Sequence, residues 1–283
     1  MYIIADSGST KTQWCVVDAQ GVATSYFTSG INAVMMTSEQ IKAVLTDEYT
    51  GPKEGIEAVY FYGAGCGPSF PAATATLAEV VNEFFGCSKL EATSDLVASA
   101  RAVCGHEAGI ACILGTGANS CYYDGEEIVK NVRPLGFILG DEGSGAVMGK
   151  KLLADVLKGL FPEDLTKLFY EDYPYEYIDF INNVYNKPRP QPNRFMASMT
   201  RFLSKHIDRP ECAKIVEQSF TEFVERNILQ YEQAKECPIS FVGSIAYYFR
   251  PQLEKVLNAY GLKLGNISQV PMDGLVEYHK NAK

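Results

Sequence analysis

The first apolar run and the turn after it decide the fold, and residues 2–12 read Tyr2-Ile3-Ile4-Ala5-Asp6-Ser7-Gly8-Ser9-Thr10-Lys11-Thr12. The run predicts a strand that ends at Asp6, followed by small residues whose backbone N–H groups can form an anion nest. Donors suited to a polyphosphate follow on Ser7, Ser9, Thr10, Lys11 and Thr12. Asp6 is placed to hold Mg²⁺ through water, because that ion keeps much of its hydration shell. The alternative interpretation is an ordinary β-hairpin turn.

A second apolar run and turn repeat this pattern, at Ile110–Leu114 and Gly115–Ser120. In both copies a strand, a small-residue turn, a second strand and an acidic turn with glycine follow one another. An internal duplication of this kind implies two similarly folded lobes about a cleft, with one turn from each lobe facing the other. Ligands of open α/β sheets bind at the carboxyl ends of strands, where both turns lie. The repeat therefore favours a nucleotide held from both sides.

Composition narrows the class of protein. A chain of 283 residues that is 47% hydrophobic can bury a sizeable core, and two domains are expected. A net charge of −9 argues against nucleic acid or an anionic membrane as partner. No basic, apolar leader precedes the first strand, and no apolar run approaches the roughly 20 residues of a membrane span, so we expect a cytoplasmic protein. The eight cysteines form no C-x-x-C pair, and several lie in apolar strands as core residues.

Periodicity predicts two lobes of alternating strands and helices. In the first lobe, residues 1–104, strands are expected at 2–5, 13–18, 22–28, 57–63 and 89–93, with helices at 38–49, 71–85 and from Asp95. The second lobe, residues 105–270, restarts the pattern at Gly109 and carries a helical insertion between Ser144 and Ala234. Strand 239–242, helix 245–259, strand 262–268 and helix 271–280 complete the chain.

Four further positions suit a binding site, and each has a structural alternative. Asp95, at a strand-to-helix junction, is either a cleft carboxylate kept ionised by the helix N-terminus or a plain N-cap. Asp141, in a glycine-rich turn, either binds sugar hydroxyls or caps the helix from Ser144. Asn32 offers a donor and an acceptor to a hydroxyl or acetamido group, or stabilises a turn. Gly243-Ser244 leaves room for a ligand against the backbone, or is a strand-to-helix turn.

Six segments, in this order, resemble the actin, hexokinase and Hsp70 superfamily, and within it the N-acetylglucosamine kinases and the wider BadF/BadG/BcrA/BcrD ATPase family. They are Asp6–Thr12, Asn32, Asp95–Ala100, Gly115–Ser120, Gly140–Gly145 and Phe241–Ala246. The last of them looks like the family's adenosine motif. The resemblance implies an α/β fold of two ribonuclease-H-like lobes, a duplicated actin-like ATPase fold around an ATP/sugar cleft, with helical additions in the second lobe. It also implies that the terminal helix, residues 271–283, crosses back to the first lobe.

The resemblance further implies phosphoryl transfer from ATP, with Mg²⁺, to the 6-hydroxyl of an amino sugar, with N-acetylglucosamine as the leading candidate. Asp95 is then the general base. The implied nucleotide-binding residues are Ser9, Thr10, Lys11, Thr12, Gly115, Thr116, Gly117, Gly243 and Ser244. The implied substrate-binding residues are Asn32, Asp95, Thr116, Leu135, Gly136 and Asp141. Pro134 and Leu135 stand where the vertebrate-type enzyme has Gly and Trp, so N-acetylmuramic acid and glucosamine stay open as substrates.

Two other functional classes remain open. The BadF/BadG group includes activator ATPases of radical dehydratases, which are dimers that share an iron–sulfur cluster, and two cysteine ligands per subunit suffice for it. A sugar-sensing regulator or a filament protein on the same scaffold is the third class, although no helix-turn-helix or basic arm precedes residue 2. A homodimer is also an open alternative for the oligomeric state.

Overall fold

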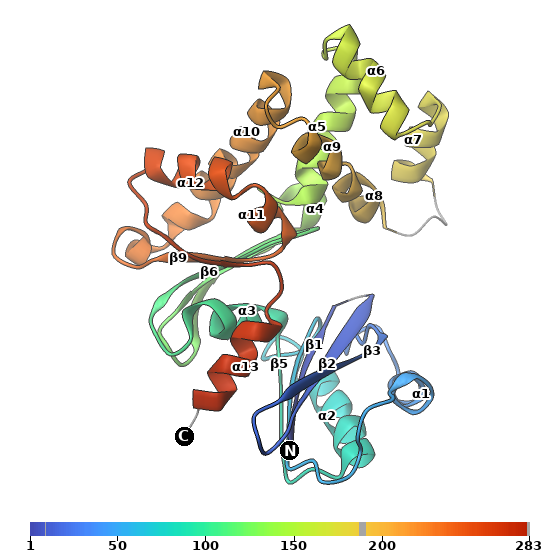
Figure 1. Ribbon diagram of the computed structural model, residues 1–283, viewed down its shortest axis with the longest axis vertical. Coiled ribbons are helices and arrows are strands. Elements are labelled where there is room, and N and C mark those ends of the chain that lie inside the picture. Colours follow the sequence, from blue (N-terminus) through green and yellow to red (C-terminus); the bar gives the residue numbers. More distant parts are fainter. Residues whose placement is uncertain (9, 187–190, 282–283) are drawn as a thin grey trace. The chain divides into compact units, whose positions relative to one another are not determined.

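The computed structural model describes residues 1–8, 10–186 and 191–281, and Ser9 therefore lies outside the described residues. The chain divides into two compact units (Figure 1). Unit 1 comprises Met1–Glu107 and the C-terminal segment from Pro271, and unit 2 comprises Ala108–Val270.

Unit 1 is a five-stranded mixed sheet in the order β3-β2-β1-β4-β5. Its strands are β1 (Tyr2–Ser7), β2 (Lys11–Val17), β3 (Ala23–Ser29), β4 (Ala58–Gly63) and β5 (Lys89–Thr93). Strands β1, β2 and β3 pair antiparallel, whereas β4 runs parallel to β1 and β5 parallel to β4. The helices are α1 (Ser38–Glu48), α2 (Pro71–Phe85), α3 (Asp95–Cys104) and α13 (Met272–Asn281).

Both faces of this sheet are buried at its central strand, which explains why β1 is a continuous apolar run. Ile3 packs into a core with residues of α1 and α2, such as Leu45 and Leu77. Ile4, which points to the opposite face, packs with Leu275 of α13 and other residues of α3 and α13. Helices therefore cover both faces.

Unit 2 repeats the topology of unit 1, with the strand order β10-β9-β6-β7-β8. Its strands are β6 (Gly109–Leu114), β7 (Ala118–Tyr123), β8 (Ile128–Val132), β9 (Ile239–Val242) and β10 (Leu264–Ser268). Again the first three strands form an antiparallel meander, and the last two are added in parallel to the first. The predicted duplication and the α/β fold class are confirmed.

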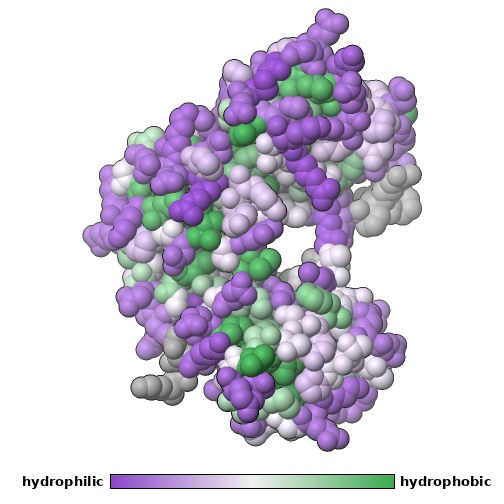
Figure 2. All heavy atoms as spheres, viewed as in Figure 1, coloured by the Kyte–Doolittle hydropathy of each residue, from purple (hydrophilic) through white to green (hydrophobic). Residues whose placement is uncertain are grey.

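The helical insertion of unit 2 lies between β8 and β9. It comprises α4 (Gly136–Leu139), α5 (Gly145–Leu157), α6 (Glu163–Asp172), α7 (Tyr177–Tyr185), α8 (Pro192–Ser198), α9 (Thr200–Lys205), α10 (Pro210–Arg226) and two 3₁₀ turns, Ile228–Gln230 and Glu232–Lys235. Its apolar residues share one core with β6 and β9. On the face drawn in Figure 2 the surface is mainly hydrophilic, with scattered apolar patches. Among the described residues, no helix combines the length and the apolar character that crossing a bilayer requires.

The prediction of one helix over residues 245–259 is wrong. Two helices, α11 (Ser244–Tyr248) and α12 (Arg250–Ala259), meet at Phe249, whose φ of −106° and ψ of 26° are not helical. Pro251 has no N–H to donate to the preceding turn, and its ring would clash with that turn in a continuous helix. The second helix therefore starts afresh, with proline in its first turn.

Helices α5 and α8 pack so closely at Gly149 that a Cβ there would lie 1.8 Å from the carbonyl oxygen of Met196. We expect Gly149→Ala to lower the free energy of unfolding of unit 2 by about 1–3 kcal/mol, as overpacked cores do. The loss should appear although alanine favours a helix over glycine by roughly 0.5–1 kcal/mol. Urea unfolding followed by circular dichroism measures the change. Ala154→Ser, on the exposed side of α5, is the control and should stay within about 0.5 kcal/mol; equal stability of Gly149→Ala and wild type would contradict the packing argument.

Candidate functional site

The first predicted phosphate turn is the tip of the β1–β2 hairpin, where the Gly8 N–H donates to the Lys11 carbonyl at 3.1 Å. Ser7 and Thr12 are both fully buried, with their hydroxyl oxygens 2.6 Å apart. The Thr12 hydroxyl also lies 3.2 Å from the Ser29 carbonyl oxygen. Thr12 therefore holds the hairpin together and presents no exposed hydroxyl to a ligand, while Thr10 and Lys11 are exposed.

Asp6 and Asp95 lie within electrostatic range of each other in unit 1. Burial raises the pKa of Asp6 to about 6, the charge of Asp95 adds to this rise, and Lys11 opposes it. Asp6 ends β1 at its carboxyl side, and Asp95 begins α3 directly after β5, so both occupy the edge where ligands of α/β sheets bind. Among the described residues, no three acidic, thiol or imidazole side chains converge as a metal site, so a cation beside Asp6 would need water or phosphate ligands.

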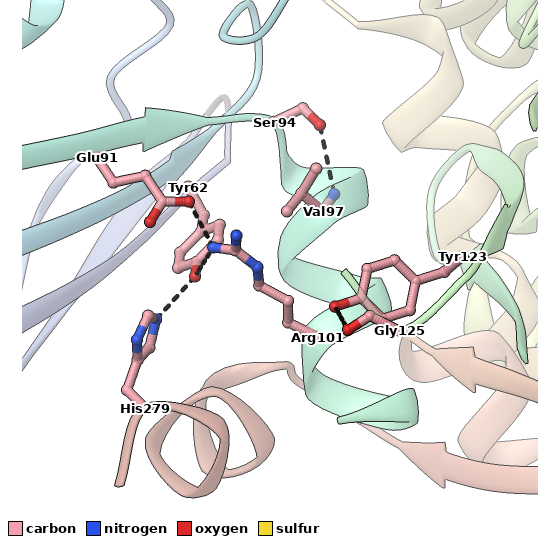
Figure 3. Close-up of polar contacts among 8 residues, drawn as sticks. All are labelled: Tyr62, Glu91, Ser94, Val97, Arg101, Tyr123, Gly125 and His279. Atoms are coloured by element: carbon pink, nitrogen blue, oxygen red, sulfur yellow. Dashed lines mark hydrogen bonds and ion pairs between the residues drawn. The ribbon is translucent and has the colours of Figure 1, made fainter. Parts of the chain in front are cut away.

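Asp95 is exposed, and it is the first residue of α3 rather than its N-cap. Ser94 caps the helix, because its side-chain oxygen accepts the Val97 N–H at 3.3 Å (Figure 3). Although solvent reaches Asp95, desolvation by the surrounding protein raises the pKa of its carboxyl, and the Leu96 N–H at the helix start opposes the rise. The carboxylate thus lies free of the helix cap, and the capping alternative does not apply.

A polar network holds α3 in place. Arg101, two turns after Asp95, donates from one guanidinium nitrogen to Glu91 at 2.6 Å and to the Tyr62 oxygen at 2.8 Å. The Tyr62 oxygen also lies 2.8 Å from His279 Nε2, on α13 (Figure 3). Since Tyr62 accepts from Arg101, its own proton is free to bond an unprotonated Nε2. The network therefore joins α3, the sheet and α13 around a neutral histidine.

The side chain of Asn32 has one group that stabilises a turn and another that is left for a ligand. Its side-chain oxygen accepts the N–H groups of Val34 and Met35 at 3.0 and 3.2 Å, which is the turn-stabilising alternative. Within the described part of the chain, no acceptor is bonded to its Nδ2 group. A donor therefore remains for a ligand hydroxyl or carbonyl.

In unit 2, the second predicted turn is the tip of the β6–β7 hairpin, and Asp141 packs directly against it. The Ala118 N–H donates to the Asp141 carboxylate, and a Cβ on Gly117 would lie 3.1 Å from a carboxylate oxygen of Asp141. Asp141 adopts a left-handed φ of 57°, which is uncommon without glycine and often marks functional sites. Ser144 is the N-cap of α5, so Asp141 is not the cap.

A pocket of about 230 Å³ surrounds Asp141 and is also lined by Leu135, Gly140, Arg133 and Arg226. The predicted residue Gly136 starts α4 beside this pocket but does not line it. Leu135 is 58% exposed. Arg226 is tied to Glu142 at 2.7 Å, whereas Arg133 forms no ion pair with any described residue. Sequence reasoning missed Arg133, because nothing in its local pattern marks it.

A larger pocket of unit 2, about 880 Å³, joins the second turn to the predicted adenosine motif. Gly115, Thr116 and Ser244 all line it, as do Tyr248 and Gln269. Gly243 is required there, because a Cβ at its φ of 126° would lie 2.3 Å from the Leu114 carbonyl oxygen. Tyr248 is 59% exposed and its hydroxyl accepts from Gln269 at 3.2 Å, so an aromatic ring lies open at the wall of this pocket.

The same pocket contains basic residues that sequence reasoning missed, on α8 and α9. They are Arg194, Arg201 and Lys205. Their spacing of seven and four residues is the only signal in the sequence, and it becomes meaningful once the helices are known to line the pocket.

Burial lowers the pKa of His279 to about 3, with the charges of Arg101, Lys89 and His106 adding to the effect. Below pH 6.5 the unfolded chain protonates this histidine and the folded chain does not. From this residue alone, the free energy of unfolding should therefore fall by about 1.4 kcal/mol for each unit by which the pH is lowered. His279→Gln keeps an acceptor for Tyr62 and cannot titrate. We therefore expect the stability of wild type relative to His279→Gln to decrease between pH 6 and pH 4.

Fluorescence of Trp14, the single tryptophan, reports unfolding of unit 1, because this residue is fully buried in its core. His206 lies in unit 2 and gives the control, since His206→Gln leaves every group around His279 unchanged and should keep the pH dependence of the Trp14 signal. Parallel pH profiles for wild type and His279→Gln would show that this histidine is not buried in its neutral form.

Comparison with known proteins agrees with this fold. The profile of the BadF/BadG/BcrA/BcrD ATPase family matches residues 5–166. No match is found among curated proteins. The solved structure of a putative N-acetylglucosamine kinase from Porphyromonas gingivalis is 43% identical, with a TM-score of 0.93 over 100% of this chain and 99% of that one.

Two more distant structures share the fold. A putative N-acetylglucosamine kinase from Chromobacterium violaceum is 17% identical, with a TM-score of 0.71 over 98% of both chains. A glucokinase of the ROK family from Streptomyces griseus, in complex with glucose and AMPPNP, is 15% identical, with a TM-score of 0.56 over 99% of this chain and 98% of that one. The family predicted from six short segments is thus confirmed: the chain belongs to the BadF/BadG/BcrA/BcrD ATPase family.

Proposed function

We propose that the protein is a Mg²⁺-dependent kinase that transfers the γ-phosphate of ATP to the 6-hydroxyl of an amino sugar, with N-acetylglucosamine as the leading substrate. The observation that carries the proposal is Asp95, an exposed carboxylate fixed at the start of a capped helix, with Asp6 in electrostatic range. The similarity over the whole chain to the Porphyromonas gingivalis protein supports the choice of substrate.

Asp95 acts as the general base in this proposal. As the sugar oxygen forms its bond to the γ-phosphorus, the bond from that phosphorus to the bridging oxygen of ADP breaks, and the hydroxyl proton passes to Asp95. A carboxylate whose pKa is raised accepts a proton more readily near neutral pH than an ordinary one. Asp6 would hold Mg²⁺ through water, and the ion would screen the phosphate charge.

The remaining roles follow from the two pockets of unit 2 and the hairpin tip of unit 1. ATP would occupy the larger pocket, with its base at Ser244 and Tyr248 and its phosphates at Gly115 and Thr116. Thr10 and Lys11 are the exposed donors of unit 1. For the sugar, unit 2 offers the Asp141 carboxylate with Leu135 as an apolar wall. Unit 1 by itself offers the Asn32 amide.

The test is ADP release in a coupled assay with N-acetylglucosamine, N-acetylmuramic acid, glucosamine, glucose or no sugar. One amino sugar should stimulate turnover, and Asp95→Asn should lower kcat by at least about 100-fold, the scale of a lost general base. Asp47→Asn, an exposed aspartate of α1, is the matched control and should keep full activity.

ADP release at the same rate with and without sugar would contradict the kinase proposal and favour an activator ATPase. Six of the eight cysteines are buried, which argues against them as ligands of a shared iron–sulfur cluster. Iron analysis of protein purified without oxygen separates the two classes directly. A colourless, iron-free protein removes the activator.

A second substrate, N-acetylmuramic acid, is favoured by Arg133. This sugar carries a lactyl ether with a carboxylate on its 3-oxygen, and Arg133 offers a guanidinium in the pocket of Asp141 and Leu135. The absence of a bulky side chain at Pro134-Leu135 leaves room for the added group. An unpaired arginine beside a substrate carboxylate gives a charge-assisted contact that N-acetylglucosamine cannot make.

If N-acetylmuramic acid is a substrate, Arg133→Met should lower kcat/KM for it by about 10-fold or more, because a hydrogen bond to a charged group contributes roughly 1.5–3 kcal/mol. The kcat/KM for N-acetylglucosamine should change less than about 2-fold, since this sugar has no carboxylate that could contact Arg133. Arg133→Lys, which keeps the charge, should recover part of the activity. Equal losses of kcat/KM for both sugars would contradict the proposed contact between Arg133 and the carboxylate, but they would not contradict the kinase proposal.

A further inference from the structure

Helices α8 and α9 form an amphipathic wall of the larger pocket in unit 2. Met199, between them, keeps helical angles with φ −76° and ψ −12°, so the two helices continue with one helical periodicity. One face is apolar and fully packed into the core, through Met196, Met199, Phe202 and Leu203. The opposite face lines the pocket with Arg194, Ala197, Ser198, Arg201, Ser204 and Lys205. The insertion thus presents a basic face to this pocket.

The charge of this face is only partly balanced. Lys205 is paired with Asp172, whose two carboxylate oxygens lie 2.7 and 2.9 Å from its ammonium nitrogen. Arg194 and Arg201 form no ion pair with any residue that the structure describes. None of the described residues that line the pocket is acidic, although the whole chain carries a net charge of −9. Two uncompensated guanidinium groups in a concave site attract anions.

The position of Ala197 relates these arginines to the second turn. A Cβ on Gly145 would lie 3.2 Å from the Ala197 Cβ and equally close to the Gly115 carbonyl oxygen. Ala197 therefore lies beside the turn Gly115–Gly117. Arg194 precedes it by three residues and Arg201 follows it by four, which is one helical turn in each direction on the same face. The two arginines thus lie one helical turn on either side of Ala197, in the wall of the pocket that Gly115 and Thr116 also line.

We infer that Arg194 and Arg201 bind the phosphates of the nucleotide held at Gly115–Gly117, so that the helical insertion supplies part of the nucleotide site. This inference rests on the proposed use of ATP. A guanidinium matches phosphate oxygens with paired, charge-assisted hydrogen bonds. These contacts form with the bound nucleotide before reaction, so they govern its affinity more than the chemical step.

The experiment is isothermal titration of the full chain with ATP, ADP and adenosine, comparing wild type with Arg194→Met, Arg201→Met and the double variant. We expect each single variant to raise Kd for ATP and ADP by about 10-fold. Adenosine, which has no phosphate, should bind all variants equally. Lys214→Met removes an exposed cation of the same unit outside the pocket and should leave every Kd unchanged. Arg201→Lys should recover part of the affinity.

The outcomes separate this inference from the proposed function. Wild-type affinity for ATP in both arginine variants would overturn the inference and leave the kinase proposal standing. An equal loss for ATP and adenosine would also overturn it, because the arginines would then act on the fold of the pocket rather than on phosphate. A wild-type protein that binds no ATP would overturn both.

Discussion

Backbone packed directly against backbone at the carboxyl end of β6 is the constraint on which the candidate site of unit 2 depends. Gly243 allows the turn after β9 to contact the Leu114 carbonyl, and Gly145 allows α5 to donate its N–H to the Gly115 carbonyl at 2.8 Å. A side chain at either glycine would push these segments apart. Because interiors are close-packed, that separation would move the walls of the large pocket as well.

The same close packing makes the helical insertion part of the site. Gly149 seats α8 on α5, and α5 in turn is bonded to the second turn, so the positions of Arg194 and Arg201 are coupled to the hairpin tip through backbone contacts. Unit 1 has no comparable insertion; there the network of Arg101, Tyr62 and His279 fixes the helix that begins with Asp95. The two units therefore share one topology but are stabilised by different contacts. Close packing at glycines holds the helices of unit 2, and polar contacts hold α3 in unit 1.

Sequence periodicity predicted most of the fold because the central strands β1, β4, β6 and β9 are largely buried and form nearly continuous apolar runs. It failed at Phe249, where the effect of Pro251 on the preceding turn outweighed an apolar helical pattern. Short motifs predicted the hairpin tips, Asp95 and Asp141 as candidates for the site. They did not show that the Thr12 hydroxyl is buried, since that depends on its pairing with Ser7 and Ser29.

The role of the basic face of α8 and α9 could not be predicted from the sequence, for a related reason. Its arginines gain meaning only from a pocket whose other walls come from residues 115–116 and 244–269, far away in the chain. A pattern read along one helix reports which face is apolar, and it does not report what the polar face meets.

The electrostatics of unit 1 link the proposed base to positive charge. Burial and the charge of Asp95 raise the pKa of Asp6 to about 6, and Lys11 offsets only part of this rise. Ionising Asp6 is therefore less favourable than ionising an ordinary aspartate. Positive charge beside this carboxylate, from Lys11 or from Mg²⁺ held there, lowers its pKa. Under the proposed function, ionisation of Asp6 and loading of the metal–nucleotide complex are consequently linked, because each makes the other more favourable.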